Sequence, residues 1–299
     1  MAGQDWIAAD WGTSHLRIWH MSADGTVKSR HTSDQGMGTL NRDGFEPALL
    51  AALPDLPGTT TVMICGMAGS RQGWCEAPYA AVPCTPPSGA QAVRVPGTDT
   101  RIDARILPGI KQDSPADVMR GEETQVAGFL ALNPGFDGVI CLPGTHSKWV
   151  HISAGEVVSF RTFVTGELFA LLSKKSVLRH SIGTEGWDDA AFAEALDQAM
   201  GRPAAFAADL FSLRAESLLQ DLSPAAARAR LSGLLIGMEL AAAKPYWLGQ
   251  SVAVLGETGL AEVYTAALEK QGLPVTRADA ERMTLEGLKA AYAQIKETA

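Results

Sequence analysis

The clearest indication of the fold is the segment Asp10-Trp11-Gly12-Thr13-Ser14-His15-Leu16-Arg17. Apolar residues lead into it from Trp6 and continue beyond it to Met21. The pattern therefore predicts a strand, a tight turn and a returning strand. Gly12 lets the backbone bend at the turn and lets a ligand approach the main chain closely.

The side chains of this hairpin suit a polyphosphate with a bound metal. Asp10 ends the first strand with a carboxylate, beside which a hydrated divalent cation could sit. Thr13 and Ser14 offer hydroxyl and N–H donors for phosphate oxygens, and Arg17 lies on the returning strand. An ordinary polar β-hairpin with a turn-capping aspartate explains the same residues, so eight residues alone leave both interpretations open.

Composition limits the class of protein. The chain has 299 residues, of which 46% are hydrophobic, so it can bury the core of two domains or of one large domain. A net charge of −8 argues against a general nucleic-acid binder. The four cysteines lack CxxC spacing, and the sequence has no signal-peptide pattern, so we expect a cytoplasmic protein. It has no long apolar stretch, so we expect no action in a membrane. The oligomeric state is unreadable, and a homo-oligomer stays open.

Strands and helices alternate along the chain, which is typical of an α/β fold with mixed sheets. Glycine-rich loops at 34–41 and 66–74 interrupt the N-terminal part, and the second follows a strand, where open α/β sheets tend to hold ligands. A polar segment at 111–117 predicts a boundary between domains 1–112 and 113–299. Helices are expected at 44–53, 118–132, 166–173, 188–200, 204–211, 223–243, 260–271 and 284–297, and strands at 60–65, 105–108, 138–142, 251–255 and 274–276.

The opening hairpin has a counterpart later in the chain. Gly12-Thr13-Ser14 and Gly144-Thr145-His146 each follow an apolar strand and precede a returning one, 132 residues apart. A duplicated hairpin predicts two similar domains that face each other across a cleft and present a glycine turn to the same polyphosphate. Chance similarity of two hairpins is the alternative.

These motifs resemble those of the sugar kinase, Hsp70 and actin ATPase superfamily. Asp10 to Arg17 looks like its first phosphate hairpin, Gly144-Thr145 like its second, and Val252 to Gly259 like its adenosine motif. The resemblance implies two domains of the ribonuclease H-like, actin-like ATPase type, with mixed sheets flanked by helices and a cleft between them. The second hairpin usually opens with Asp, but here that place is Leu142, so metal handling would rest on Asp10.

The chain also resembles, nearly end to end, the bacterial 2-dehydro-3-deoxygalactonokinases. That family phosphorylates the terminal 6-hydroxyl of 2-dehydro-3-deoxy-D-galactonate with ATP and Mg²⁺ in galactonate catabolism. A kinase of another sugar acid or sugar, a phosphatase or polyphosphate hydrolase on the same fold, and a non-catalytic nucleotide-binding regulator are the alternatives. The resemblance rests on the segments 119–125, 143–150, 160–162, 165–168 and 231–237.

The substrate hydroxyl needs an acceptor for its proton, and Glu122 is the leading candidate for this base. Glu122 follows Gly121 at an expected helix start, where related phosphatases of the superfamily carry a Gly-x-Glu-Glu-type signature. Asp117 and Asp10 are the alternatives, and a first-turn glutamate also favours a helix dipole without any catalytic role. We therefore assign Glu122 and Asp10 as catalytic and Asp10 as the metal ligand.

The remaining site residues follow from charge and turn chemistry. A guanidinium can grip the carboxylate of a 2-keto acid with two parallel hydrogen bonds, although each arginine alone could be a surface cation. Glu239 could reach a ribose hydroxyl or be a solvated helix residue. The nucleotide-binding candidates are Gly12, Thr13, Ser14, Arg17, Gly144, Thr145, His146, Lys148, Gly256, Thr258 and Gly259. The substrate-binding candidates are Gln35, Gly36, Asn41, Ser70, Arg71, Arg120 and Arg161.

Overall fold

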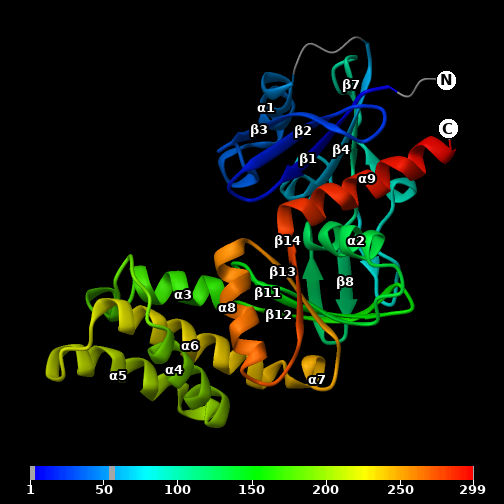
Figure 1. Ribbon diagram of the computed structural model, residues 1–299. Helices are drawn as coiled ribbons and strands as arrows, with labels where there is room; N and C mark the ends of the chain where they lie inside the picture. Colours follow the sequence, from blue (N-terminus) through cyan, green and yellow to red (C-terminus); the bar gives the residue numbers. More distant parts are fainter. Residues whose placement is uncertain (1–3, 54–57, 299) are drawn as a thin grey trace. The chain divides into compact units, whose positions relative to one another are not determined.

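The computed structural model describes residues 4–53 and 58–298 as an α/β chain that divides into two compact units (Figure 1). Unit 1 comprises Met1–Asp137, Ile152–Ser159 and Asp279–Ala299, and unit 2 comprises Gly138–His151 and Phe160–Ala278. Over the described residues, no helix has the length and apolar character that crossing a membrane requires.

In the described part of unit 1, six strands form a mixed sheet around the opening hairpin. The second strand returns antiparallel to the first, with Asp10 opposite Arg17, and the fourth runs parallel to the first, with Cys65 beside Asp10. The predicted hairpin is therefore confirmed. The order across the sheet is β3 (Val27–Ser33), β2 (Leu16–Met21), β1 (Trp6–Trp11), β4 (Thr60–Gly66), β7 (Ile102–Ile106) and β6 (Val93–Arg94).

Alternation along β1 buries both faces of this sheet. Ile7 and Trp11 pack in a cluster with Phe45 of α1 (Phe45–Ala52). On the other face, Trp6 lies in a cluster with Tyr292 of α9 (Ala280–Thr298), and the two rings stack with centroids 4.1 Å apart. The C-terminal helix is thus part of the core around the N-terminal strand.

Helix α2 (Glu122–Leu132) lies beside α9 (Figure 1). A Cβ atom at Gly128 would lie 1.9 Å from the Met283 carbonyl oxygen, and one at Gly287 would lie 2.0 Å from the Thr124 carbonyl oxygen. Only glycine fits this helix crossing. A smaller sheet of β5 (Ala80–Ala81), β8 (Ile110–Asp113) and β9 (Ala116–Met119) leads into α2.

The second sheet has the order β12 (Glu156–Phe163), β11 (Ser147–Ser153), β10 (Gly138–Leu142), β13 (Val252–Gly256) and β14 (Val275–Asp279). β10 and β13 run parallel, so their carboxyl ends meet at one edge. The helices that follow these strands in unit 2 are α3 (Thr165–Lys174), α4 (Asp189–Gly201), α5 (Phe206–Leu219), α6 (Pro224–Ala242), α7 (Lys244–Trp247) and α8 (Thr258–Glu269). Short 3-10 turns lie at Met37–Thr39, Arg42–Gly44, Met67–Gly69, Gly89–Gln91, Val177–His180 and Pro203–Ala205.

Several boundaries differ from those expected. The segment 111–117, expected as a domain boundary, contributes to the β8–β9 hairpin, and α2 consequently begins at 122 rather than 118. The compact units also differ from the division into 1–112 and 113–299. Residues 113–137 and 279–299 group with the N-terminal sheet, because α9 packs on β1 and β4 and also on α2. Residues 152–159 belong to the same unit and include Val157, which pairs with Cys84.

Candidate active site

The glycine-rich loop 34–41 packs against the turn of the first hairpin. The Gly12 N–H donates to the His15 carbonyl at 2.9 Å, which closes the turn and leaves Thr13 and Ser14 exposed at its tip. The Met37 and Gly38 N–H groups donate to the carbonyls of Gly12 and Thr13 at 3.0 and 2.8 Å. The turn therefore keeps its shape while its tip stays open to a ligand.

Asp10 lies at the carboxyl end of β1, beneath this turn. Its Oδ2 accepts a hydrogen bond from Arg17 Nη1 at 3.2 Å, and Cys65 Sγ lies 3.7 Å from its Oδ1. Burial raises the pKa of Asp10, and the charge of Arg17 opposes the shift. The negative charge of Glu122 raises this pKa further, so the two carboxylates interact electrostatically.

The two glutamates at the start of α2 have different surroundings. The Arg120 N–H donates to Glu122 Oε2 at 3.1 Å, and the Gly121 N–H donates to Glu123 Oε2 at 2.7 Å. Glu123 is 1% exposed, and burial together with the charge of Glu122 raises its pKa to about 8. Glu122 is half-buried. Of the two carboxylates, that of Glu122 is therefore the more accessible.

Arg120 is tied to the loop that follows β4. Its Nη2 donates to the Ala77 carbonyl at 2.7 Å, and its guanidinium lies 4.3 Å from the centre of the Tyr79 ring. Its Nη1 atom and the Ser70 hydroxyl are both buried without a protein partner among the described residues. Arg71, by contrast, is exposed and forms an ion pair with Glu76 at 3.7 Å.

The other polar candidates of unit 1 lie on the 34–41 loop and on β9. The Gln35 carbonyl accepts from Trp11 Nε1 at 2.9 Å, which anchors the 34–41 loop, and its side chain is exposed. Asn41 is also exposed, before the turn Arg42–Gly44. Asp117, the alternative base, lies on β9 and accepts from the Val118 N–H at 2.8 Å.

In unit 2, the start of α3 packs against the second turn. A Cβ atom at Gly166 would lie 2.3 Å from the Gly144 carbonyl oxygen, and the Glu167 N–H donates to the Thr145 carbonyl at 2.9 Å. His146 Nε2 lies 2.8 Å from Glu167 Oε2. Thr145 and His146 are exposed.

The turn after β13 lies against the turn after β10. A Cβ atom at Gly256 would lie 3.1 Å from Pro143 Cγ, so little space separates the two turns. Thr258 and Gly259 are exposed and open α8, and the positive end of a helix dipole is suited to an anion. Lys148 is 4% exposed, and its Nζ donates to the His146 carbonyl at 3.4 Å. Arg161 is exposed on β12.

Neither interpretation of Glu239 from the sequence was correct. Its side chain on α6 is 1% exposed and accepts hydrogen bonds from Trp149, Thr165 and Tyr264. It is therefore neither solvated nor accessible to a ribose hydroxyl. Burial raises its pKa, which these donors counteract.

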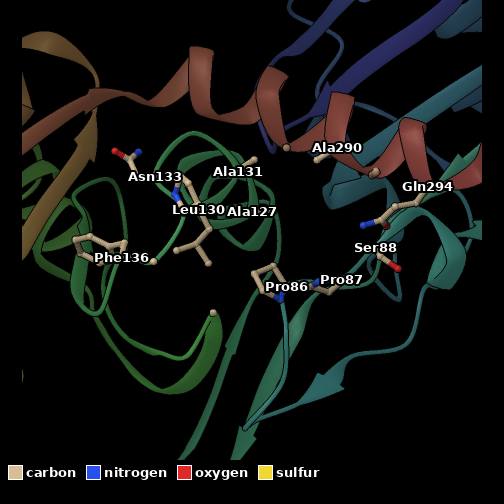
Figure 2. Close-up of a pocket in the computed structure, with 15 residues that line it drawn as sticks. Pro86, Pro87, Ser88, Ala127, Leu130, Ala131, Asn133, Phe136, Ala290 and Gln294 are labelled. Carbon is tan, nitrogen blue, oxygen red and sulfur yellow. The ribbon is translucent and has the colours of Figure 1, made fainter.

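A separate cavity of about 360 Å³ lies in unit 1, between the loop around Ser88 and the facing parts of α2 and α9 (Figure 2). Its lining contains prolines, alanines and glycines together with Leu130 and Phe136, and it includes no charged side chain. It therefore lacks the cations that a polyphosphate requires, and Asp10 and Glu122 are not part of it.

The structure thus brings the unit 1 candidates together as Asp10, Arg17 and Glu122, and those of unit 2 as the two adjoining turns. Cys65 and Tyr79 were missed. The strand register places Cys65 next to Asp10, and the fold of the 66–79 loop places Tyr79 against Arg120.

Comparison with known proteins agrees with this architecture. The model of the 2-keto-3-deoxy-galactonokinase family matches residues 10–291. A probable 2-dehydro-3-deoxygalactonokinase of Rhizobium meliloti (strain 1021) is 42% identical, with 96% of each chain covered. The 2-dehydro-3-deoxygalactonokinase of Escherichia coli (strain K12) is 35% identical, with 91% of each covered.

Solved structures show the same fold. A Sinorhizobium meliloti protein, provisionally named a 2-dehydro-3-deoxygalactonokinase, has a TM-score of 0.88 at 40% identity and covers 97% of this chain and 99% of its own. Component A of (R)-2-hydroxyglutaryl-CoA dehydratase from Acidaminococcus fermentans, at 13% identity and a TM-score of 0.50, covers 99% of both and is similar in fold alone. The fold is the expected α/β actin-like ATPase type with mixed sheets. The chain belongs to the 2-keto-3-deoxy-galactonokinase family.

Proposed function

We propose that the protein transfers the γ-phosphoryl group of ATP to the terminal 6-hydroxyl of 2-dehydro-3-deoxy-D-galactonate. The products are 2-dehydro-3-deoxy-6-phosphogalactonate and ADP, and the reaction serves galactonate catabolism in the cytoplasm. The observation that carries this proposal is the family match over residues 10–291, which includes both glycine turns and the start of α2. The first hairpin, with Asp10, Arg17 and Glu122 grouped beneath it, supplies matching chemistry.

Phosphoryl transfer requires mainly positioning and neutralisation of charge. In the proposed mechanism, the exposed tip of the first hairpin donates to phosphate oxygens through Thr13 and Ser14. Arg17 contributes positive charge beside it. In unit 2, the Gly144-Thr145 turn holds phosphate and the turn at Gly256 lies near the adenosine. The exposed Thr258 and Gly259 at the start of α8 support this assignment.

Glu122 is the proposed general base. The Arg120 N–H donates to one of its carboxylate oxygens, and this half-buried side chain at the start of α2 is proposed to accept the proton of the attacking hydroxyl. Glu123 is too deeply buried for this role, because only 1% of it is exposed. Asp10 pairs with Arg17 and is assigned to the metal ion, and Asp117 lies on β9, before the start of α2. Glu122 therefore remains preferred over its alternatives.

Mg²⁺ fits this site only as a cation held mostly by water and phosphate. Within the described part of the chain, no group of three or more His, Cys, Asp or Glu side chains is arranged to hold a metal ion. Mg²⁺ commonly binds through one or two carboxylates together with substrate phosphates and water, and Asp10 can supply one carboxylate. When bound, the ion would neutralise charge on the phosphates.

The carboxylate of the sugar acid is proposed to bind an arginine. Arg71 is exposed at the loop after β4, whereas the guanidinium of Arg120 is fixed by Ala77 and Tyr79. Arg71 is therefore the more accessible ligand of the two. Ser70, Gln35 and Asn41 are proposed to contact hydroxyl groups.

The test is a coupled assay of ADP release with a panel of keto-deoxy sugar acids and aldoses. We expect ADP release to depend on 2-dehydro-3-deoxy-D-galactonate and to be accompanied by its 6-phosphate. Release at the same rate without any acceptor would identify a hydrolase instead. Faster turnover with another sugar acid or an aldose would reassign the substrate.

A further inference from the structure

We propose that Glu239 is a positioning residue that holds the nucleotide-binding turns of unit 2 in place without touching the nucleotide. This inference rests on the proposed function, because that function assigns these turns to ATP. The observation behind it is a buried hydrogen-bond network centred on Glu239 and formed by four different elements of unit 2.

The network connects Glu239 to the strand that follows the second turn. Trp149 of β11 donates through Nε1 to Glu239 Oε1 at 2.8 Å. Tyr264 of α8 lies with its hydroxyl 2.8 Å from Glu239 Oε2 and 2.9 Å from the hydroxyl of Ser147. Ser147 is the first residue of β11, directly after the turn. Glu239 therefore fixes the strand on which the turn ends.

The same carboxylate fixes the start of α3. The hydroxyl of Thr165, the first residue of α3, donates to Glu239 Oε2. The next two residues contact the turn directly, because Gly166 lies against the Gly144 carbonyl and the Glu167 N–H donates to that of Thr145. A displacement of Thr165 would consequently move the backbone against which the turn packs.

Through Tyr264, the network also includes the helix that opens at the proposed adenosine turn. Tyr264 lies on α8, which begins at Thr258, and it is 1% exposed. One carboxylate thus bonds, directly or through one hydroxyl, to β11, α3 and α8. Of these elements, β11 follows the turn at Gly144, α8 follows the turn at Gly256, and α3 packs against the first of these turns.

Close packing fixes the backbone position of Glu239 itself. A Cβ atom at Gly233 would lie 2.5 Å from the Phe192 carbonyl oxygen, and one at Gly237 would lie 2.6 Å from that of Leu196. Helix α6 is thereby held against α4, and the carboxylate cannot follow the turns if they shift. A buried acid is costly unless its surroundings bond it, and three side chains donate to this one. These bonds require the three donors to keep fixed positions around one carboxylate.

The decisive variant is Glu239→Leu, which leaves the donors on Trp149 and Thr165 without their acceptor. We expect its Kd for ATP with Mg²⁺ to rise about 10–100-fold, as for other residues that orient ligand-binding groups from behind. We expect the KM for the sugar acid to change much less. Glu239→Gln keeps the volume and one acceptor oxygen and should recover most of the affinity.

Trp247→Phe is the matched control. Trp247 is 3% exposed in the same unit, and its Nε1 donates to the Leu240 carbonyl at 2.9 Å, so the variant removes a buried hydrogen bond without touching the network. We expect it to lower the melting temperature while the Kd for ATP stays close to wild type. Equal affinities in Glu239→Leu and Trp247→Phe, both measured below their melting temperatures, would overturn the proposal.

Two further results separate this inference from the proposed function. If Glu239→Leu fails to fold, Tyr264→Phe carries the test, because it removes the hydroxyl that links Glu239 to α8 and to Ser147 and leaves the bonds from Trp149 and Thr165 in place, and unchanged ATP affinity there would overturn the inference. A wild-type protein that binds ATP but does not phosphorylate the sugar acid would refute the proposed function, and the Kd values would still decide the role of Glu239. A wild type that binds no ATP would refute both.

Discussion

Two adjacent glutamates at the start of α2 illustrate how strongly position changes the chemistry of one side chain. Glu122 and Glu123 each accept a backbone N–H within the Arg120–Gly121 segment. Successive helical residues point about 100° apart, so one carboxylate is half-buried and the other is almost fully enclosed. The first is accessible enough for the base that we propose, and the second is part of the core.

Replacing Glu122 with Gln should abolish most of the turnover. A general base contributes about 10²–10⁴-fold to such reactions, so we expect kcat to fall within that range while the Kd for ATP stays close to wild type. Steady-state kinetics and ATP titration measure the two quantities. Glu194→Gln, on the exposed face of α4, is the control and should leave both unchanged. Near-normal turnover of the Glu122 variant would remove it as the base.

Glu123 should make the stability of the protein depend on pH. Its pKa is about 8 in the folded state, against 4.5 ordinarily, so the folded protein binds more protons than the unfolded chain between these values. Its stabilising contribution is therefore complete below pH 4.5 and is lost as the pH rises toward 8. Burial and the charge of Glu122 raise this pKa, whereas hydrogen bonds from the backbone at 121 and 123 and the charge of Arg120 oppose the rise.

Urea unfolding of wild type and Glu123→Gln between pH 5 and 8.5 tests this dependence. The variant cannot ionise, so the wild type should lose stability relative to it by up to about 1.4 kcal/mol per pH unit. Parallel stability curves for the two proteins would show that Glu123 is ionised in the folded state at pH 7.

At this scale, sequence patterns located Asp10, Arg17 and Glu122 because turns and helix starts have local signatures. The pairing of Asp10 with Arg17 was implicit in the hairpin, whereas Cys65 became its neighbour only through parallel pairing with a distant strand. Glu239 was misjudged because its partners come from positions 149, 165 and 264. No local pattern records such a network.

At the scale of elements, the first hairpin depends on the loop behind it. A Cβ atom at Gly36 would lie 2.3 Å from the Ser14 carbonyl carbon and 2.4 Å from the Thr13 carbonyl oxygen. These are backbone atoms, so they cannot rotate away as a side chain would. Any side chain at position 36 must displace the hairpin tip or the loop.

Gly36→Ala should therefore impair catalysis more than stability. A displacement of about 1 Å can cost 10²-fold in rate, so we expect kcat/KM for ATP to fall about 10–100-fold. Gly201→Ala is the control, since nothing lies within 4 Å of a Cβ atom at that helix end, and it should retain full activity. Equal activity of both variants would show that the loop does not hold the hairpin.

Element types were more predictable than their ends. Helix α6 was expected at 223–243 and spans Pro224–Ala242, because Ser223 and Pro224 mark its start. Helix α2 was expected from 118, but Ala116–Met119 pair with β8 and Gly121 adopts a φ of +110° before the helix begins. Tertiary pairing overrode the local helical pattern there.

At the scale of the whole molecule, α9 completes a core cluster whose other residues include Trp6 and Ala8 of β1. The ring of Tyr292 stacks on Trp6, and the same cluster includes Trp19 and Leu107. Hydrophobic periodicity predicted the helix, yet it could not reveal that this helix packs on the N-terminal sheet. That return explains why a boundary near residue 112 does not coincide with the compact units.

Tyr292→Ala should destabilise unit 1. Truncating a large buried aromatic residue costs about 3–5 kcal/mol, so the corresponding unfolding transition should occur at a clearly lower temperature. Tyr292→Phe keeps the stacked ring and should lose little. Calorimetry of both variants measures the difference, and equal losses would place the contribution in the hydroxyl group rather than in the stack.

Unit 1 is built from three separate segments of the chain, and this has a consequence for its synthesis. Its third segment, Asp279–Ala299, is synthesised after the whole of unit 2. Translation at about 5–20 residues per second leaves an interval on the order of 10–30 s between the synthesis of residue 137 and that of residue 279. All of unit 2 emerges during that interval, so the later-encoded unit can finish folding first. Until then, Trp6 and its neighbours lack the helix that covers them, so this apolar surface of the nascent chain is open to aggregation.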